Sequence, residues 1–294
     1  MHKLRLLAGV IGLARSAPSA QAARAHHSAI VDPPRDAFYP AHNQQLLIPS
    51  HGSGMNALLF VASGKGPHRT VILMHGLPGN ERNLDLAQAI RRAGWDVLTF
   101  TYRGAWGSPG DFSISNAMED AQAALDFARS DAGAKLGIDS SHIVLAGHSM
   151  GGATAIETAA HATGLDGLIL IDAWDIAGDG RGYSKAELLT EFNDFGNSLR
   201  GATPQSTIDE IIANGNQWDL VVAGARIKRL PVLTVSAKFA GAASNRPVTA
   251  AIRHSGNAHV TAIEMATDHA FSDHRIALAQ AVVGWLDRLP PLNR

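Results

Sequence analysis

The sequence feature that most constrains the fold is a five-residue turn, residues 147–151, which reads Gly-His-Ser-Met-Gly. A short apolar run at 143–146 precedes the turn, and the residues from 150 to about 162 favour a helix. A Gly-x-Ser-x-Gly sequence between a strand and a helix is typical of a nucleophile elbow, with Ser149 at its tip. Flanking glycines fit such a turn, because bulky neighbours would collide and glycine accepts unusual backbone angles. The alternative is an ordinary turn in which Ser149 only caps the helix.

Short apolar runs recur along the chain and alternate with helical patterns. The apolar runs lie at 58–61, 71–74, 97–102, 143–146, 168–171, 232–235 and 260–265. Apolar stripes with helical spacing lie at 81–93, 118–129 and 273–289, and Asn116 and Glu119 have capping-box spacing before the second of these. Strands without polar alternation are typical of a parallel sheet that is covered on both faces. The sequence therefore predicts an α/β protein with a doubly wound, mostly parallel sheet.

About 60 residues between the runs at 168–171 and 232–235 interrupt this alternation. A glycine-rich stretch at 178–182 predicts a loop, and Ser184 with Glu187 at capping-box spacing predicts the start of a helix. A second helix is expected near 207–214. The segment at about 173–229 is therefore a helical insertion at the carboxyl edge of the sheet. It is either a lid over a site or a structural layer of helices.

Length, charge and cysteine content exclude several classes of function. A chain of 294 residues is compatible with one large α/β domain. The net charge of −1 gives no electrostatic reason to expect a nucleic-acid partner. The absence of cysteine excludes disulfides and a thiol nucleophile. We expect no metal, no cofactor and no membrane span, and the sequence does not indicate an oligomeric state.

The N-terminal residues have the pattern of an export signal. Residues 1–5 are basic, residues 6–14 form a short apolar core, and 20–22 fit a small-x-small cleavage site. We therefore expect a signal peptide at 1–22, a single domain at 23–294, and a periplasmic or extracellular location. A disordered tail is the alternative.

A serine nucleophile needs a base, which is usually a histidine. The last predicted strand ends at Met265, so His269 lies in the loop at the carboxyl edge of the sheet, the same edge as the elbow. His274 is the competitor, but it falls in the first turn of the last helix. His75 and His148 are expected to serve packing or hydrogen bonding.

Two main-chain N–H groups are needed to stabilise an oxyanion. Met150 directly follows Ser149 and supplies one of them. The other is expected from the turn after the strand at 71–74, where Pro78 has no N–H and Leu77 is the best donor.

Four segments occur in the order seen in one known family. They are the His75-Gly76 turn, the stretch 102–110 that begins Tyr-Arg-Gly, the elbow, and the Asp268-His269 loop. Together they resemble serine hydrolases of the α/β-hydrolase fold, especially the prolyl oligopeptidase catalytic domain and dienelactone-hydrolase-like enzymes. The resemblance covers about residues 46–289 and implies an acyl-enzyme mechanism.

The sequence departs from that family at the triad acid. Members usually carry it in the loop after the strand that matches 231–235, but residues 236–245 contain no carboxylate, and Ala240 stands about where an aspartate is expected. Some members of the wider fold place the acid after the preceding strand. Asp172 follows 168–171 and is therefore the first candidate, unless it caps the strand end. Asp175 is the second candidate, and Asn245 is an uncharged third.

These observations predict a serine hydrolase that cleaves small carboxylic esters through an acyl-enzyme intermediate. Ser149 would attack, His269 would act as base, Asp172 would orient it, and Leu77 and Met150 would hold the oxyanion. A serine peptidase or thioesterase of the same fold is the alternative. A non-catalytic binding protein built on this fold is the alternative from another class.

Overall fold

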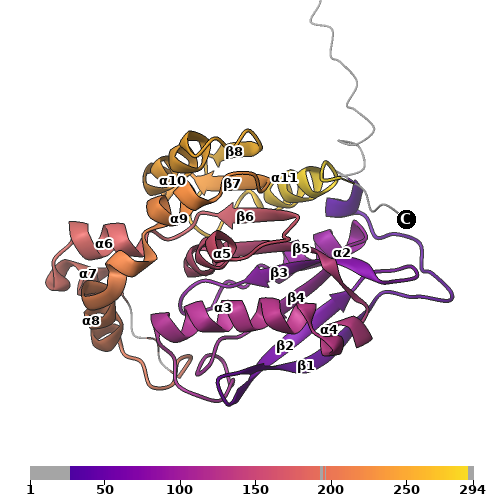
Figure 1. The fold of residues 1–294 in the computed structure, drawn as a ribbon, viewed down its shortest axis with the longest axis horizontal. Helices are drawn as coiled ribbons and strands as arrows, with labels where there is room; N and C mark the ends of the chain where they lie inside the picture. Colours follow the sequence, from indigo (N-terminus) through magenta and orange to yellow (C-terminus); the bar gives the residue numbers. More distant parts are fainter. Residues whose placement is uncertain (1–26, 193–194, 196, 291–294) are drawn as a thin grey trace, which may run out of the picture.

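The computed structural model describes residues 27–192, 195 and 197–290 of the chain. The predicted signal peptide at 1–22 lies outside the described residues. Eight strands form one sheet in the order β1-β2-β4-β3-β5-β6-β7-β8 (Figure 1). Their bounds are β1 His42–Ser50, β2 Ser53–Val61, β3 His68–Met74, β4 Asp96–Phe100, β5 Ile138–His148, β6 Gly167–Ile171, β7 Val232–Ala237 and β8 Val260–Met265.

Six of the eight strands, β3 to β8, run parallel, as predicted for a doubly wound sheet. The run at 58–61 belongs to β2, which pairs antiparallel with both β1 and β4, so the prediction of a parallel strand there was wrong. The sequence pattern also missed β1. This edge strand is mostly exposed and begins with polar residues, so it has no apolar run.

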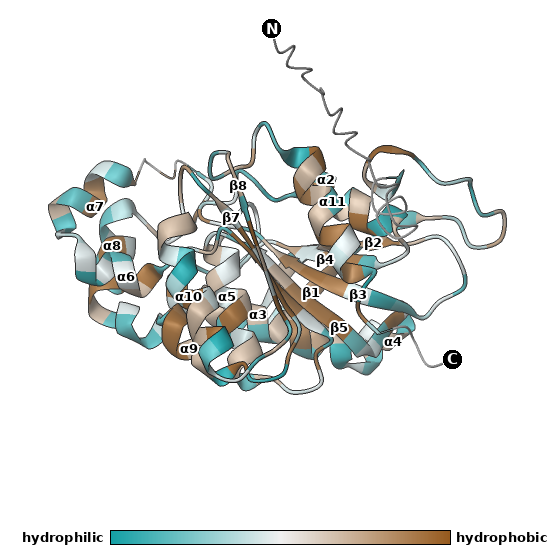
Figure 2. Ribbon diagram, turned by 90° about the horizontal axis from the view of Figure 1, so that it is seen from above, coloured by the Kyte–Doolittle hydropathy of each residue, from teal (hydrophilic) through white to brown (hydrophobic). Residues whose placement is uncertain are grey.

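Helices cover both faces of the sheet. Their bounds are α2 Leu84–Arg92, α3 Ile114–Arg129, α4 Asp131–Lys135, α5 Met150–His161, α6 Ile176–Gly182, α7 Lys185–Glu191, α8 Pro204–Asn214, α9 Leu220–Arg226, α10 Ala242–His254 and α11 Arg275–Leu286. One buried cluster joins the sheet to α3, α5, α9 and α10, and a second joins it to α2 and α11. Figure 2 shows the resulting layers, with the apolar strands between the helices.

One helix start differs from the prediction, and another agrees with it. Helix α3 begins at Ile114, because the Ser113 side chain accepts the N–H of Asn116 and so acts as the N-cap. Asn116 is therefore inside the helix and does not begin a capping box. In α7 the predicted capping box of Ser184 and Glu187 is confirmed.

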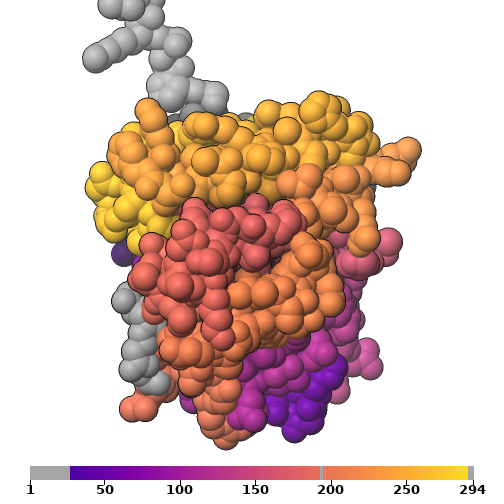
Figure 3. All heavy atoms as spheres, turned by 90° about the vertical axis from the view of Figure 1, so that its left-hand side faces the viewer, coloured from indigo at the N-terminus to yellow at the C-terminus, as the bar shows by residue number. Residues whose placement is uncertain are grey.

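The segment between β6 and β7 consists of α6 to α9 and a short 3-10 turn, Gly215–Trp218. It projects from one end of the molecule, and its outer surface fills the middle of the view in Figure 3, coloured salmon to orange. The stretch 178–182 is part of helix α6, so the predicted loop was wrong. Its glycines allow close packing, since a Cβ on Gly180 would lie 3.2 Å from Ile211 and one on Gly178 would lie 2.3 Å from Asp175.

The segment after β7 also differs from expectation. Residues 236–245, read from the sequence as a loop, contain the end of β7, a short turn at 238–241 and the start of α10. Helix α10 has no side-chain N-cap, so the usual start signal is missing. It also contains Pro247, which normally ends or kinks a helix.

Candidate active site

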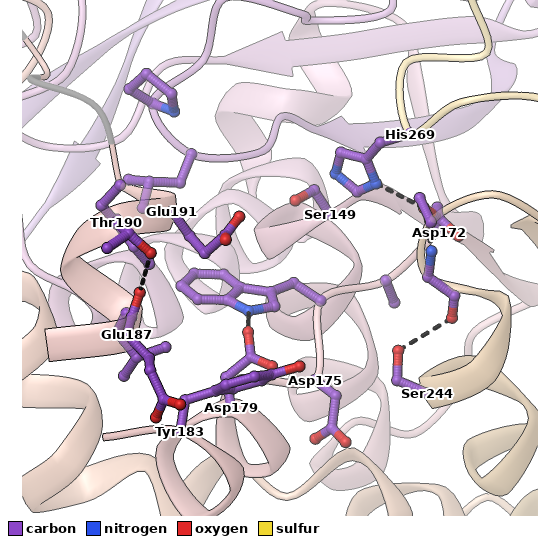
Figure 4. Close-up of a pocket in the computed structure, with 18 of the residues that line it drawn as sticks. Ser149, Asp172, Asp175, Asp179, Tyr183, Glu187, Thr190, Glu191, Ser244 and His269 are labelled. Atoms are coloured by element: carbon purple, nitrogen blue, oxygen red, sulfur yellow. Dashed lines mark hydrogen bonds and ion pairs between the residues drawn. The ribbon is translucent and has the colours of Figure 1, made fainter. Parts of the chain in front are cut away.

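Ser149 occupies a strained position between β5 and α5. Its backbone angles are φ 57° and ψ −123°, which a non-glycine residue rarely adopts. Such strain persists only where the surrounding structure holds it in place. Figure 4 shows the Ser149 side chain at the wall of a cavity.

The glycines beside Ser149 are required by space. A Cβ on Gly147 would lie 1.9 Å from the Gly151 carbonyl oxygen, and a Cβ on Gly151 would lie 2.2 Å from the Met74 carbonyl oxygen. Neither glycine has a positive φ. The predicted collision is therefore correct, but the expectation that these glycines supply unusual backbone angles was wrong, because Ser149 itself adopts them.

Main-chain hydrogen bonds join the elbow to the end of β6. The Ser149 N–H donates to the Ile171 carbonyl at 3.1 Å, and the Trp174 N–H donates to the Ser149 carbonyl at 3.0 Å. Two residues lie between those partners, and the first of them is Asp172, which has a φ of 42°. The backbone thus places Asp172 directly beside the elbow.

The structure brings His269 and Asp172 into direct contact. The Nδ1 of His269 lies 2.6 Å from Oδ2 of Asp172, which is fully shielded from solvent. In Figure 4 the imidazole ring lies between Asp172 and Ser149. Since a carboxylate oxygen accepts, Nδ1–H donates, and the neutral ring keeps its lone pair on Nε2. That arrangement leaves His269 able to accept a proton from the side of Ser149.

The last residue of β7 and the turn after it hold the Asp172 carboxylate. The N–H of Ala237 donates to Oδ1 at 2.8 Å, and the N–H of Gly241 donates to Oδ2 at 3.1 Å. A Cβ on Gly241 would lie 2.6 Å from Oδ1, so only glycine allows this approach. The loop that lacks a carboxylate of its own therefore supplies two donors to the carboxylate of the neighbouring strand.

The other acid candidates have different partners. Asp175 is the N-cap of α6, where its side chain accepts the Gly178 N–H, and in Figure 4 its carboxylate points away from His269. The amide of Asn245 donates to the carbonyls of Ala173 and Gly241. Neither side chain is placed to orient His269.

His274 lies outside the cavity. It is the residue just before α11, and its Nδ1 lies 2.8 Å from Asp273. The prediction of a first-turn position was wrong by one residue, because α11 begins at Arg275.

The two predicted oxyanion donors belong to different segments, the start of α5 and the turn after β3. Met150 begins α5, so its N–H is one of the first-turn groups that have no acceptor within the helix. Leu77 lies in the turn after β3 and lines the cavity. This turn approaches the elbow closely, since a Cβ on Gly76 would lie 2.8 Å from the Ser149 Cβ.

Trp106 also shapes this turn, and the sequence analysis missed it. Its indole Nε1 donates to the Pro78 carbonyl at 2.8 Å, from a residue with a φ of 47°. The only available signal was the glycine-rich stretch 102–110, which did not identify this contact.

A cavity of about 860 Å³ joins the triad residues to the α6–α7 region. No Lys or Arg is among the described residues that line it. The acidic and aromatic lining residues of the α6–α7 region are Trp174, Asp175, Asp179, Tyr183, Glu187, Glu191, Phe192 and Phe195. Of these residues, the sequence analysis named only Asp175, as a candidate acid, and Glu187, as part of a helix cap, because the insertion folds from local caps and lacks a motif.

The pKa of the Asp179 carboxyl group is raised above its usual value. Burial raises the pKa of its carboxyl group, and the charges of Asp175 and Glu191 raise it further, against the hydrogen bond from the Trp174 indole. The α6–α7 part of the cavity lining is therefore electronegative.

Within the described ranges, no three His, Asp or Glu side chains form a group that could hold a metal ion. Over the same residues, no helix has the length and apolar character needed to cross a bilayer.

Comparisons with known proteins give two kinds of likeness. A family model described as "Serine aminopeptidase, S33" matches residues 65–184, which include Ser149 and Asp172 but end before His269. No curated protein matches the chain.

Solved structures match over most of the chain. A hyperthermophilic esterase from the archaeon Pyrobaculum calidifontis has a TM-score of 0.63 at 19% identity, covering 92% of this chain and 91% of its own. Est1E from Butyrivibrio proteoclasticus, solved with ferulic acid bound, has a TM-score of 0.65 at 19% identity, covering 83% and 98%. An enol-lactonase from Burkholderia xenovorans has a TM-score of 0.59 at 18% identity, covering 81% and 98%.

Proposed function

We propose that this chain, which has the α/β-hydrolase fold, is a serine hydrolase that cleaves small carboxylic esters. The observation that carries the proposal is the 2.6 Å hydrogen bond between His269 and the buried Asp172, beside a strained elbow serine that lines the same cavity. A histidine that is oriented by a carboxylate and lies next to a serine hydroxyl is the arrangement that activates serine for acyl transfer.

The proposed reaction has two steps. The Ser149 oxygen attacks the ester carbonyl carbon while its proton passes to Nε2 of His269, and the N–H groups of Leu77 and Met150 hold the oxyanion. The proton then moves to the leaving alcohol as the C–O bond breaks, which leaves an ester of Ser149. A water molecule, deprotonated by His269, attacks that ester, and the carboxylic acid leaves as Ser149 regains its proton.

The cavity supports a small substrate. Its volume of about 860 Å³ lies within the range of small-molecule sites. The structural likeness to a Pyrobaculum esterase and to an enol-lactonase adds support for ester chemistry.

A panel of p-nitrophenyl esters of increasing acyl length tests the proposal. The wild type should hydrolyse acetate and butyrate esters and should be labelled by a fluorophosphonate probe. Ser149→Ala should lose the label and about 10⁴–10⁶ in kcat. A wild type that neither hydrolyses these esters nor accepts the probe would support the binding-protein alternative.

The acidic lining of the cavity favours peptidase activity as a second candidate. A free amino terminus is cationic at neutral pH, and Asp175, Asp179 and Glu191 surround one end of a cavity that lacks described Lys and Arg side chains. Aromatic rings such as Trp174 also attract cations. The family description adds support.

Matched aminoacyl p-nitroanilides separate the two candidates. A peptidase should cleave the free-amine substrate and lose most of that activity when the amine is acetylated. Asp179→Asn should raise KM for the free amine only. Cleavage of esters but of neither anilide would favour the esterase. No specific observation favours a thioesterase.

We also propose that residues 1–22 direct export to the periplasm or outside the cell. The basic start, short apolar core and small-x-small site support this. Mass spectrometry of the protein from its native host should find Ala23 at the N-terminus, and an intact Met1 would contradict the proposal.

A further inference from the structure

The residue before the nucleophile makes an unexpected contact with the base. The Nε2 of His148 lies 2.8 Å from the main-chain carbonyl oxygen of His269. The two imidazole rings are also in contact, with their centroids 4.6 Å apart and their planes tilted by 38°. The side chain at position 148 therefore contacts both the backbone and the ring of the residue that would act as base.

The protonation of His148 follows from this contact. A carbonyl oxygen only accepts, so Nε2 carries the proton and Nδ1 has the lone pair. Burial, followed by the nearby His269, lowers the pKa of His148 to about 4. The ring is therefore neutral at the pH at which a histidine base works, and its N–H donor is permanent.

The other ring nitrogen is buried without a partner. Nδ1 of His148 has no hydrogen-bond partner among the described residues, and the side chain is only 4% exposed. An unsatisfied buried polar atom destabilises a fold, because it loses its hydrogen bonds to water. Since Phe would fill similar space without this cost, packing alone does not explain an imidazole here.

We infer that His148 is a positioning residue, which fixes the His269 main chain relative to Ser149 through its Nε2–H donor. This inference rests on the proposed function. Ser149 and His148 are neighbours in the same turn, so movement of the elbow carries the donor with it. The imidazole of His269 then keeps its position relative to the hydroxyl group of Ser149.

A second donor holds the next carbonyl of the same loop. Nη1 of Arg275 donates to the Ala270 carbonyl at 2.9 Å, and its other nitrogens bond Asn83 and Asp85 near the start of α2. Two consecutive carbonyls are thus held from two directions. With His148 removed, Arg275 still anchors the loop, so the loss should be confined to the alignment of His269.

Three substitutions separate positioning from packing. His148→Phe keeps a buried ring and removes the donor. His148→Gln places an amide N–H at about the reach of Nε2, whereas His148→Asn reaches only to about the position of Nδ1. With p-nitrophenyl acetate we expect kcat to fall about 10- to 100-fold in the Phe and Asn variants, with KM nearly unchanged, because small misplacements of a catalytic group have effects of this size. Gln should recover most of kcat.

Thermal unfolding and imidazole ¹⁵N NMR complete the experiment. His148→Phe should unfold at the same or a higher temperature than wild type, while the His269 ring signals shift. Gln and Phe variants of equal activity, or losses of kcat that follow losses of stability, would overturn the inference. If the wild type has no esterase activity, the proposed function fails, whereas an unchanged His269 signal in the Phe variant contradicts the positioning role on its own.

Discussion

The carboxyl edge of the sheet and the α6–α9 insertion both line the cavity, but they are built differently. At the sheet edge, a Cβ at position 147 or 151 would overlap main-chain atoms, so only glycine fits there. Main-chain N–H groups hold Asp172. In the insertion, side chains cap α6, α7 and α8, and exposed ion pairs such as Lys185 with Asp209 join the helices. The edge is therefore fixed mainly by backbone contacts, whereas the helices of the insertion are capped and joined by side chains, together with the close packing of Gly178 and Gly180.

The largest expected effect at the sheet edge is the loss of kcat when the proposed base, His269, is removed. His269→Ala should lower kcat by about 10⁴–10⁶, nearly as much as loss of the serine, because members of a triad act as a unit. His274→Ala is the matched control and should keep most activity, since its ring pairs with Asp273 outside the cavity. Initial rates with p-nitrophenyl acetate measure both. A larger loss in the His274 variant would contradict the assignment of the base.

The acid should give the next largest effect. Asp172→Asn should lower kcat by about 10⁴, because the amide no longer holds His269 in the tautomer that accepts the serine proton. Asp175 lines the same cavity from the insertion, but its side chain accepts the Gly178 N–H. Asp175→Asn should therefore change kcat little. Single-turnover labelling with a fluorophosphonate should be slow in the first variant and normal in the second. Equal effects would mean that the hydrogen bond to His269 does not set the rate.

Two glycine substitutions compare the regions in stability. Gly151→Ala should lower the free energy of unfolding by more than about 3 kcal/mol, because its Cβ would overlap a main-chain carbonyl that cannot move aside. Gly182→Ala, at the end of α6, has no atom within 4 Å of the added Cβ and should stabilise by about 0.5 kcal/mol. Urea unfolding measures both. Equal losses would show that the insertion is packed as tightly as the edge.

The buried histidines of the edge should make stability depend on pH. Burial lowers the pKa of His75 and of His148 from 6.5 to about 4. The unfolded chain therefore binds their protons between about pH 6.5 and pH 4 while the folded chain does not, so the free energy of unfolding falls as pH is lowered through this window. His148→Phe should remove about 2 kcal/mol of that fall. Urea unfolding at pH 7 and pH 4.5 measures the difference, and an unchanged slope would mean that His148 is already protonated in the fold.

Sequence reasoning worked where a residue has one physical role. The apolar runs located β2 to β8, and Ser184 with Glu187 marked the start of α7. The approach of Asp172 to His269 was expected from its place after a parallel strand, and the structure has that contact. Reasoning failed for α6, whose glycines suggested a loop, and for the start of α10, which was read as part of the loop at 236–245; tertiary packing formed a helix in each place. It also missed Trp106 and the acidic cavity lining, because such contacts depend on how distant segments meet.

The main-chain donors to Asp172 determine which substitutions the segment 237–241 can accept during evolution. Because Ala237 and Gly241 contribute only their N–H groups, most substitutions between them leave the carboxylate held. Proline at either position is the exception, since it has no N–H, and any side chain at 241 would meet the carboxylate. The side chains of the turn at 238–240 are therefore not needed to hold Asp172. Exposed residues there, such as Phe239, can be substituted without loss of these two hydrogen bonds.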